Sequence, residues 1–306
     1  MRKVLFLCVA GLGASSAALA ADAARPPITS VSHLAVYAAD AAKAEHFYVH
    51  DLGAVKRADP ENPQGARYHF SSAQFVEVLP LPANAGANRM DHVAFNTANA
   101  ESLRKYLAAK NIQVPAAATK GADGSQWFQV KDPEGILVEF VQPPSPRPAI
   151  AANPLFGHII HVGAVVHDRA LEDGFYRDIL GFRPYWFGGM KDDAPPSWVS
   201  QQVPNGPDWL EYMVTSNVLN QAQMGVLNHF SLGVPNMEKV YTALWNEDRL
   251  QGQVDRSGQQ IVPKIGRDAK WQLNLIDPDG TRAEVMELHA IGKPCCSPFT
   301  AADPEK

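Results

Sequence analysis

This chain of 306 residues has few cysteines and no excess of basic charge. It has three cysteines, and only Cys295 and Cys296 lie beyond the N-terminal segment, so no disulfide framework can hold the fold together. These two could form a vicinal disulfide or pair between chains, but a surface tail is the simpler interpretation. Basic residues number 27 against 32 acidic ones, which argues against a nucleic-acid partner.

The N-terminal segment has the layout of a secretory signal. Arg2 and Lys3 precede an apolar run that begins at Val4, and small residues lead to a cleavage site after Ala20, with Ala23 as the alternative. The run is too short, and too diluted by glycine and serine, for a membrane anchor. We therefore expect residues 1–20 to be a signal peptide and the mature protein to be periplasmic or secreted, without membrane contact. Cleavage leaves 25 basic and 32 acidic residues, a formal charge of −7.

One strand–helix pattern occurs twice, which indicates an internal duplication. The two copies start from His33 and His161, and each continues with an aspartate at offset seven, a Phe-Tyr pair from offset fourteen and a glycine at offset twenty (Asp40, Asp168; Phe47, Phe175; Gly53, Gly181). Apolar alternation before the aspartate favours a strand. Apolar residues at helical spacing between the aspartate and the glycine favour an amphipathic helix.

Four such modules, each a strand, a helix and three further strands, account for most of the chain. The second and fourth modules close with an Asp-Pro-x-Gly turn, at Asp132 and Asp277, followed by a strand that carries one glutamate. The proline-rich run that starts at Pro143 can continue neither a helix nor a central strand. The predicted fold class is thus α+β, with domains at 28–142 and 157–289, a linker at 143–156 and a tail at 290–306.

A histidine on the first strand and a glutamate on the last strand recur in all four modules. The histidines are His33, His92, His161 and His229, and the glutamates are Glu77, Glu139, Glu211 and Glu284. His158 and Glu287 are near alternatives, but an odd offset puts them on the opposite strand face. Imidazole and carboxylate ligands without thiolate suit a divalent Fe, Mn, Ni or Zn ion and argue against a structural zinc knot.

These motifs together resemble the vicinal oxygen chelate superfamily, which includes glyoxalase I, extradiol dioxygenases, methylmalonyl-CoA epimerase and bleomycin-resistance proteins. The resemblance covers roughly residues 28–289. It implies four βαβββ modules paired into two cup-shaped mixed-sheet domains, each with a metal inside that two vicinal substrate oxygens chelate. The implied ligands are His161, Glu211, His229 and Glu284 in domain two, our preferred site. In domain one His33, Glu77, His92 and Glu139 would form a second site or a relic.

The subfamily motifs do not agree with one another. Extradiol dioxygenases would use His161, His229 and Glu284, but they also place a histidine before the second ligand histidine and a tyrosine shortly before the glutamate. Residues 211–228 contain no histidine and residues 270–283 no tyrosine. The four-ligand set resembles that of glyoxalase I more closely, because Glu211 or Glu284 could leave the metal and act as a base. The thiol cosubstrate of glyoxalase I is cytoplasmic, however, whereas the predicted signal peptide would export this protein.

Three functional hypotheses follow. The first is an exported metal-dependent lyase or isomerase that moves a proton with Glu211 or Glu284. The second is an Fe(II) ring-cleaving dioxygenase, and the third a non-catalytic small-molecule binding protein of the bleomycin-resistance type.

Aromatic residues give the clue to the ligand. Trp209 has the strand parity of Glu211, and Tyr185 and Trp186 form a cluster, so these three are candidate substrate contacts for a small apolar or aromatic molecule. Because both domains lie in one chain, a monomer and a homodimer are both compatible with the sequence.

Overall fold

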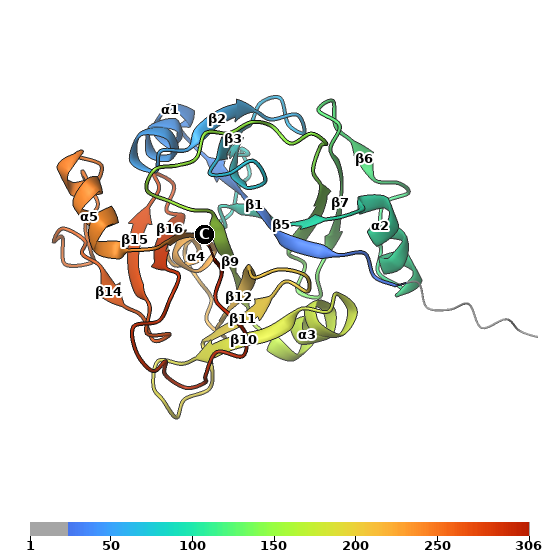
Figure 1. Cartoon of the computed structure of the whole chain (residues 1–306). Helices are drawn as coiled ribbons and strands as arrows, with labels where there is room; N and C mark the ends of the chain where they lie inside the picture. The colour runs from blue at the N-terminus through green and yellow to red at the C-terminus, as the bar shows by residue number, and fades with distance from the viewer. Residues whose placement is uncertain (1–23, 306) are drawn as a thin grey trace, which may run out of the picture.

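The computed structural model describes residues 24–305. The predicted signal peptide, residues 1–20, lies outside the described residues. Among the described residues, no helix is long and apolar enough to cross a membrane. Two curled eight-stranded sheets dominate the molecule, one on each side of the linker (Figure 1).

The first sheet comes from modules one and two. Its elements are β1 (Ile28–Ala38), α1 (Ala41–Glu45), the π-helical turn η1 (His46–Asp51), β2 (Val55–Ala58), β3 (Ala66–His69), β4 (Phe75–Pro80), β5 (Met90–Thr97), α2 (Ala100–Ala109), β6 (Thr119–Lys120), β7 (Gln126–Lys131) and β8 (Leu137–Gln142). The strand order is β2-β3-β4-β1-β5-β8-β7-β6.

The second sheet repeats this plan. Its elements are β9 (Ile159–Val166), α3 (Arg169–Asp173), η2 (Gly174–Ile179), β10 (Arg183–Gly188), β11 (Trp198–Gln202), β12 (Trp209–Val214), α4 (Gln221–Leu227), β13 (His229–Val234), α5 (Met237–Asn246), β14 (Lys264–Ile265), β15 (Trp271–Ile276) and β16 (Arg282–Glu287). The order β10-β11-β12-β9-β13-β16-β15-β14 matches the first sheet position for position. The predicted fold of four βαβββ modules in two mixed sheets is confirmed, and α4 is an addition to it.

Local sequence explains where the module-one and module-three helices begin and end. Asp40 and Asp168 are N-caps whose carboxylates accept hydrogen bonds from the backbone N–H groups two and three residues on. Gly53 and Gly181 follow the helices with φ of +67° and +77°, a left-handed conformation that favours glycine. These residues are the repeated motif of the sequence, and they return the chain to the sheet.

The two domains exchange a reciprocal pair of contacts. The Tyr48 hydroxyl donates to Asp277 Oδ2 at 2.9 Å, and the Tyr176 hydroxyl donates to Asp132 Oδ2 at 3.3 Å. Each tyrosine belongs to a Phe-Tyr pair and each aspartate to an Asp-Pro-x-Gly turn. Both sequence motifs therefore meet at the interface, and the main hydrophobic cluster runs through both domains.

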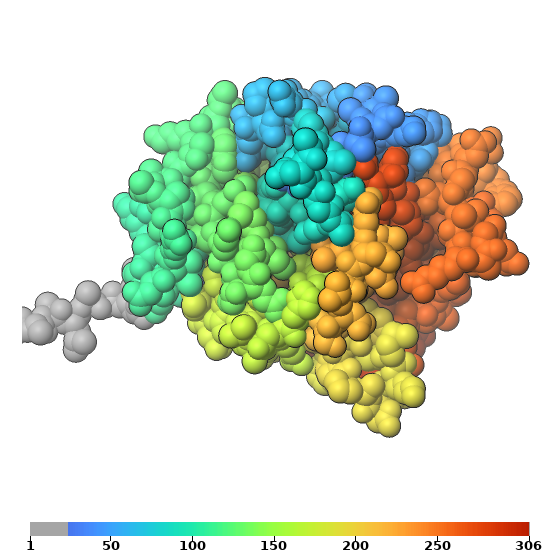
Figure 2. All heavy atoms as spheres, turned by 180° about the vertical axis from the view of Figure 1, so that it is seen from behind, coloured from blue at the N-terminus to red at the C-terminus, as the bar shows by residue number. Residues whose placement is uncertain are grey.

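A second strip of the interface lies between loops and strand ends. The Gln74 side chain donates to Ile159 O at 2.8 Å and accepts from Ile159 N at 3.1 Å. On the face seen in Figure 2, the segment before β5 lies against α4, and Arg89 Nη2 donates to Gln221 Oε1 at 3.0 Å.

The C-terminal tail packs against the second domain. The Phe299 ring lies tilted beside Tyr185, with 5.0 Å between ring centroids. The fully buried Lys270 ammonium donates to Asp303 Oδ1 at 2.6 Å and to Leu288 O at 2.8 Å. Cys295 and Cys296 form a vicinal disulfide. The tail is thus an integral part of the second domain.

Candidate metal centres

Four side chains converge inside the second sheet, and all four are buried: His161, Glu211, His229 and Glu284. The two Nε2 atoms are 3.1 Å apart. His161 Nε2 lies 3.1 Å from Glu284 Oε2, and His229 Nε2 lies 3.5 Å from Glu211 Oε2. The structure therefore brings together all of the candidate ligands named from the sequence of this domain.

Strand order explains this convergence. The four residues lie on β9, β12, β13 and β16, which are consecutive in the sheet as β12-β9-β13-β16. Strand alternation sends the alternative residues elsewhere: His158 Nε2 lies 3.3 Å from Asp208 Oδ1, and Glu287 Oε1 accepts from Met237 N at 2.6 Å. Neither residue joins the cluster.

Gly163 makes room for the His229 ring. It lies opposite His229 in the β13–β9 pairing. A Cβ atom at Gly163 would lie 3.0 Å from Nε2 of that ring and closer still to Nδ1 and Cε1. The ring therefore occupies the volume of a missing side chain. On its other side His229 Nδ1 bonds to Leu227 O at 2.8 Å, which fixes the ring and leaves Nε2 facing the cluster.

Burial and neighbouring charges shift the pKa values of Glu211 and Glu284 in opposite directions. Burial lowers the pKa of His161 and lowers that of His229 well below its usual value, so both imidazoles are neutral. Burial, then Glu284, raises the pKa of Glu211 to about 8. Burial also acts to raise the pKa of Glu284, but Arg282 at 3.4 Å and His161 outweigh it and bring the value to about 2.

The donor set fits a divalent metal ion. Two imidazole nitrogens bound at about 2.1 Å and at right angles to each other would lie about 3.0 Å apart, and the Nε2 atoms are 3.1 Å apart. Neutral imidazoles and carboxylates are suitable ligands for Fe, Mn, Ni or Zn ions. The buried Glu284 Oε2 accepts no hydrogen bond. His161, His229 and Glu284 with Glu211 would hold the ion.

A cavity of about 210 Å³ reaches this cluster from outside, and both Glu211 and Glu284 line it. Of the expected aromatic contacts, Trp186 lines the cavity. Trp209 instead stacks on His161 with 4.7 Å between ring centroids. Tyr185 lies behind Trp209, at 5.1 Å. One of the three candidates therefore reaches the open space, and the other two support the ligand shell.

Sequence analysis missed several residues of the cavity wall. Trp198, Arg267, Asp268, Gln272 and Arg282 line it. Arg282 had a readable signal, since it lies two residues before Glu284 on one strand and so shares its face. The others lie on β11, on β15 or in the loop before β15, and no repeat marks them.

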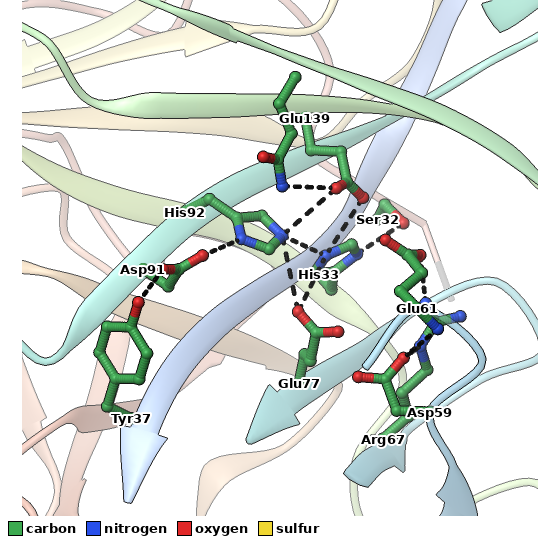
Figure 3. A network of polar contacts seen from close by, with 11 residues as sticks. Ser32, His33, Tyr37, Asp59, Glu61, Arg67, Glu77, Asp91, His92 and Glu139 are labelled. Atoms are coloured by element: carbon green, nitrogen blue, oxygen red, sulfur yellow. Dashed lines mark hydrogen bonds and ion pairs between the residues drawn. The ribbon is translucent and has the colours of Figure 1, made fainter. Parts of the chain in front are cut away.

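The first sheet holds an equivalent cluster, shown in Figure 3 with its surrounding polar network. His33 Nε2 and His92 Nε2 are 2.8 Å apart. Glu77 Oε2 and Glu139 Oε2 lie 3.7 and 3.8 Å from His92 Nε2. Buried Glu139 Oε1 accepts no hydrogen bond, so this donor set also fits a divalent ion.

The surroundings of the first cluster differ from those of the second. His92 Nδ1 lies 2.7 Å from Asp91 Oδ2, and Gln129 donates to Glu139 at 2.9 Å. Arg67, paired with Asp59 at 3.2 Å and with Glu61, lies beside the cluster (Figure 3). A cavity of about 340 Å³ touches Arg67 but none of the four candidate ligands. The cavity beside the first site therefore ends at Arg67, whereas the cavity of the second site is lined by two candidate ligands.

Comparisons with known proteins agree with this architecture. Residues 30–140 match the model of the Glyoxalase/Bleomycin resistance protein/Dioxygenase superfamily. Among proteins with curated descriptions, none matches the chain.

Solved structures with the same fold include homoprotocatechuate 2,3-dioxygenase from Brevibacterium fuscum in an anaerobic complex with 3,4-dihydroxyphenylacetate. It is 16% identical with a TM-score of 0.61 over 90% of this chain and 85% of that one. The 2,3-dioxygenase LapB from a Pseudomonas species is 15% identical with a TM-score of 0.61 over 86% and 93%. A catechol 2,3-dioxygenase is 14% identical with a TM-score of 0.62 over 92% and 96%. At these identities the likeness shows a shared fold.

Proposed function

Because residues 30–140 belong to the Glyoxalase/Bleomycin resistance protein/Dioxygenase superfamily and both domains have the vicinal oxygen chelate fold, we propose that the second domain is a metal-dependent active site. Its substrate would be a small molecule with two adjacent oxygen atoms, and its reaction a proton transfer, isomerisation or lysis. The observation that carries this proposal is the cavity of about 210 Å³ that ends on Glu211 and Glu284.

The two glutamates would have different tasks. When bound, a divalent ion acts as a Lewis acid toward adjacent substrate oxygens. Glu284 contacts His161 at 3.1 Å and Arg282 at 3.4 Å, so its carboxylate is held in place as a ligand. Glu211 borders the cavity and contacts only His229, at 3.5 Å, among described polar groups. Because its pKa is about 8, Glu211 would act as a base in its ionised form, which a divalent cation nearby favours, and it could then take a proton from the substrate and return it.

The remaining walls would hold the substrate and exclude water. Trp186 and Trp198 offer flat apolar surfaces, and Met286 closes the apolar side. Trp209 stacks on His161 and keeps that ring from turning. An aromatic ring, or an apolar chain of similar size, is the substrate body that such walls accommodate.

A ring-cleaving dioxygenase is the second candidate, and one observation favours it. His161, His229 and Glu284 present a two-histidine, one-carboxylate set, the type that non-haem Fe(II) oxygenases use, in a two-domain chain. Under this alternative Glu211 would be dispensable for metal binding and turnover. Oxygen consumption with a catechol in the iron-loaded protein would then be measurable.

The test begins with metal content per chain, measured on the mature protein purified without chelator. We expect bound metal that His161→Ala removes from the second site, with His33→Ala as the matched variant of the first. Activity lost with either Glu211→Gln or Glu284→Gln supports the four-ligand enzyme, and activity retained by Glu211→Gln alone supports the dioxygenase. A wild-type chain that binds no divalent ion, even when ions are supplied, would refute both and leave a metal-free binding protein.

We also propose that the protein is exported. The support is the sequence before Ala21, in which two basic residues precede an apolar run and small residues. This segment lies outside the described residues. N-terminal sequencing of the protein recovered from a periplasmic extract should start at Ala21. A start at Met1 in the cytoplasmic fraction would overturn this proposal.

A further inference from the structure

A second hollow adjoins the cavity of the second domain. This outer groove has a volume of about 500 Å³ and shares Gln272 and Arg282 with the cavity that reaches Glu211 and Glu284. Its lining residues come from α4, from the loop before β14, and from β14, β15 and β16. Apolar side chains form much of its lining: Val226, Val254, Ile261, Val262 and Ile276. A molecule bound near the two glutamates therefore has an adjacent apolar surface past Arg282.

The outer groove is rich in positive charge. Arg256, Lys264 and Arg282 line it, and Asp255 is the acidic residue beside them. Asp255 Oδ1 accepts hydrogen bonds from Ser257 N, Ser257 Oγ and Gln259 N at 2.8, 2.6 and 3.2 Å, so this carboxylate holds its own turn. In the described part of the chain, neither Arg256 nor Lys264 forms an ion pair. The groove thus presents two cations without an ion pair in the described residues, and a third, Arg282, whose contact with Glu284 is 3.4 Å long.

Arg282 is the residue on which the two hollows meet. Its side chain is 12% exposed, and its Nε is buried without a hydrogen bond. Its Nη1 has only two distant contacts, 3.4 Å to Glu284 Oε1 and 3.4 Å to Asn274 Oδ1. A divalent ion bound to Glu284 would neutralise part of the negative charge of that carboxylate, and so weaken its ion pair with Arg282. A buried guanidinium whose counter-charge is drawn away is costly unless another anion approaches.

An arginine at this strand position is specific to the second domain. Arg282 lies two residues before Glu284, and Leu137 is the residue two before Glu139 in the first domain. Duplication therefore preserved the glutamate and changed its neighbour from apolar to basic, or the reverse. The first cluster has its own arginine, Arg67 on β3, but that side chain is paired with Asp59 and Glu61. Arg282 pairs with a candidate ligand instead, which favours a role toward the ligand of the second site.

We infer that the substrate of the second domain is an amphipathic acid, whose adjacent oxygens enter the inner cavity and whose carboxylate pairs with Arg282 at the head of the outer groove. This inference rests on the proposed function. A planar guanidinium with unused donors matches a carboxylate with two parallel hydrogen bonds. The apolar lining suits the carbon chain between the two ends, and Arg256 and Lys264 attract the acid from solution.

The test compares acids with their own methyl esters. The probes are 3,4-dihydroxyphenylacetate, 3-(3,4-dihydroxyphenyl)propanoate and the two methyl esters, bound to full-length protein loaded with redox-inactive Zn²⁺. Dissociation constants would be measured by calorimetry, or by quenching of the cavity tryptophans. We expect the wild type to bind each acid about 5- to 30-fold more tightly than its ester, as for a partly buried charged hydrogen bond.

Variants separate the inference from its premise. Arg282→Met should remove the preference for the acids, and the double variant Arg256→Met with Lys264→Met, which touches no candidate ligand, should reduce it. Lys105→Met on α2 is the matched control and should leave it unchanged. Acids and esters that bind the wild type with equal affinity would overturn the inference and leave the proposed function standing. If the zinc-loaded protein binds neither acids nor esters, the proposed function itself fails.

Discussion

Gly163→Ala is the sharpest test of the second site, because it adds one methyl group where the His229 ring lies. The new Cβ would lie 3.0 Å from Nε2 and closer to Nδ1 and Cε1. Carbon and ring atoms in contact are usually about 3.5–4.0 Å apart, so Nε2 must shift by at least about 0.5 Å. A shift of that size exceeds what a metal-ligand constellation tolerates.

The expected loss can be stated for stability and for metal binding. Overpacking of a buried site costs about 1–3 kcal/mol of unfolding free energy. A misdirected ligand ring should weaken the metal affinity of the second site by about 10- to 100-fold. Affinity would be measured by competition with a chromophoric chelator, in a His33→Ala background so that only the second site is observed.

The duplicated chain supplies its own control. Ala35 lies opposite His92 in the β1–β5 pairing, at the position that Gly163 occupies in β9. Ala35→Gly should leave metal binding in the first site unchanged, because there the ring already tolerates a methyl group. Unchanged metal affinity in Gly163→Ala, with the ring in place, would refute the argument that this glycine sets the position of His229.

Two further predictions concern buried charges away from the metal centres. Burial, then Asp132 and Glu134, raises the pKa of Glu172 to about 8. The folded state therefore holds a proton that the unfolded state releases from about pH 4.5 upward. The stability that protonated Glu172 provides is complete below that pH and is lost as pH rises toward 8, and Glu172→Gln should flatten this decline in urea titrations. Asp303→Asn removes the counter-charge of buried Lys270 and should lower the unfolding free energy by about 1–3 kcal/mol.

Exposed carboxylates serve as controls for both changes. Glu238→Gln should leave the pH dependence of stability as in the wild type, and Asp193→Asn should leave the unfolding free energy within about 0.5 kcal/mol. A Glu172→Gln protein whose stability falls between pH 5 and 8 as steeply as that of the wild type would show that Glu172 contributes nothing to the decline. An Asp303→Asn protein as stable as the wild type would show that Leu288 O and water suffice for Lys270.

Most of the fold and the ligand set could be predicted from sequence because duplication shows them more than once. A histidine that recurs at one offset from a helix and a glutamate that recurs after a turn are constrained by the same strand geometry in each copy. The offset of twenty residues to Gly181, which His33 shares with respect to Gly53, selected His161 over His158, and strand parity places these two histidines on opposite faces. Sequence reasoning therefore predicts the strand on which each candidate ligand lies and the sheet face to which its side chain points.

Features that occur once were beyond the same reasoning. Trp209 has the parity of Glu211, yet it does not line the cavity of the second site. Its ring stacks on the His161 ring instead. The tail that places Phe299 on Tyr185 has no counterpart after the first domain. Arg282 differs from its duplicate. Such contacts depend on side-chain packing between distant segments, which alternation alone does not encode.

The reciprocal bonds from Tyr48 to Asp277 and from Tyr176 to Asp132 have a consequence for how the chain is assembled. A contact made twice, with the two halves in exchanged roles, is the arrangement of an isologous dimer. The molecule therefore behaves as a covalent dimer of its own domains, and residues 143–156 replace association between chains by a tether. Because the two domains are covalently joined, their sequences no longer had to remain identical. Each site has two histidines and two glutamates, yet a cavity is lined by the glutamates of the second site and the cavity beside the first stops at Arg67.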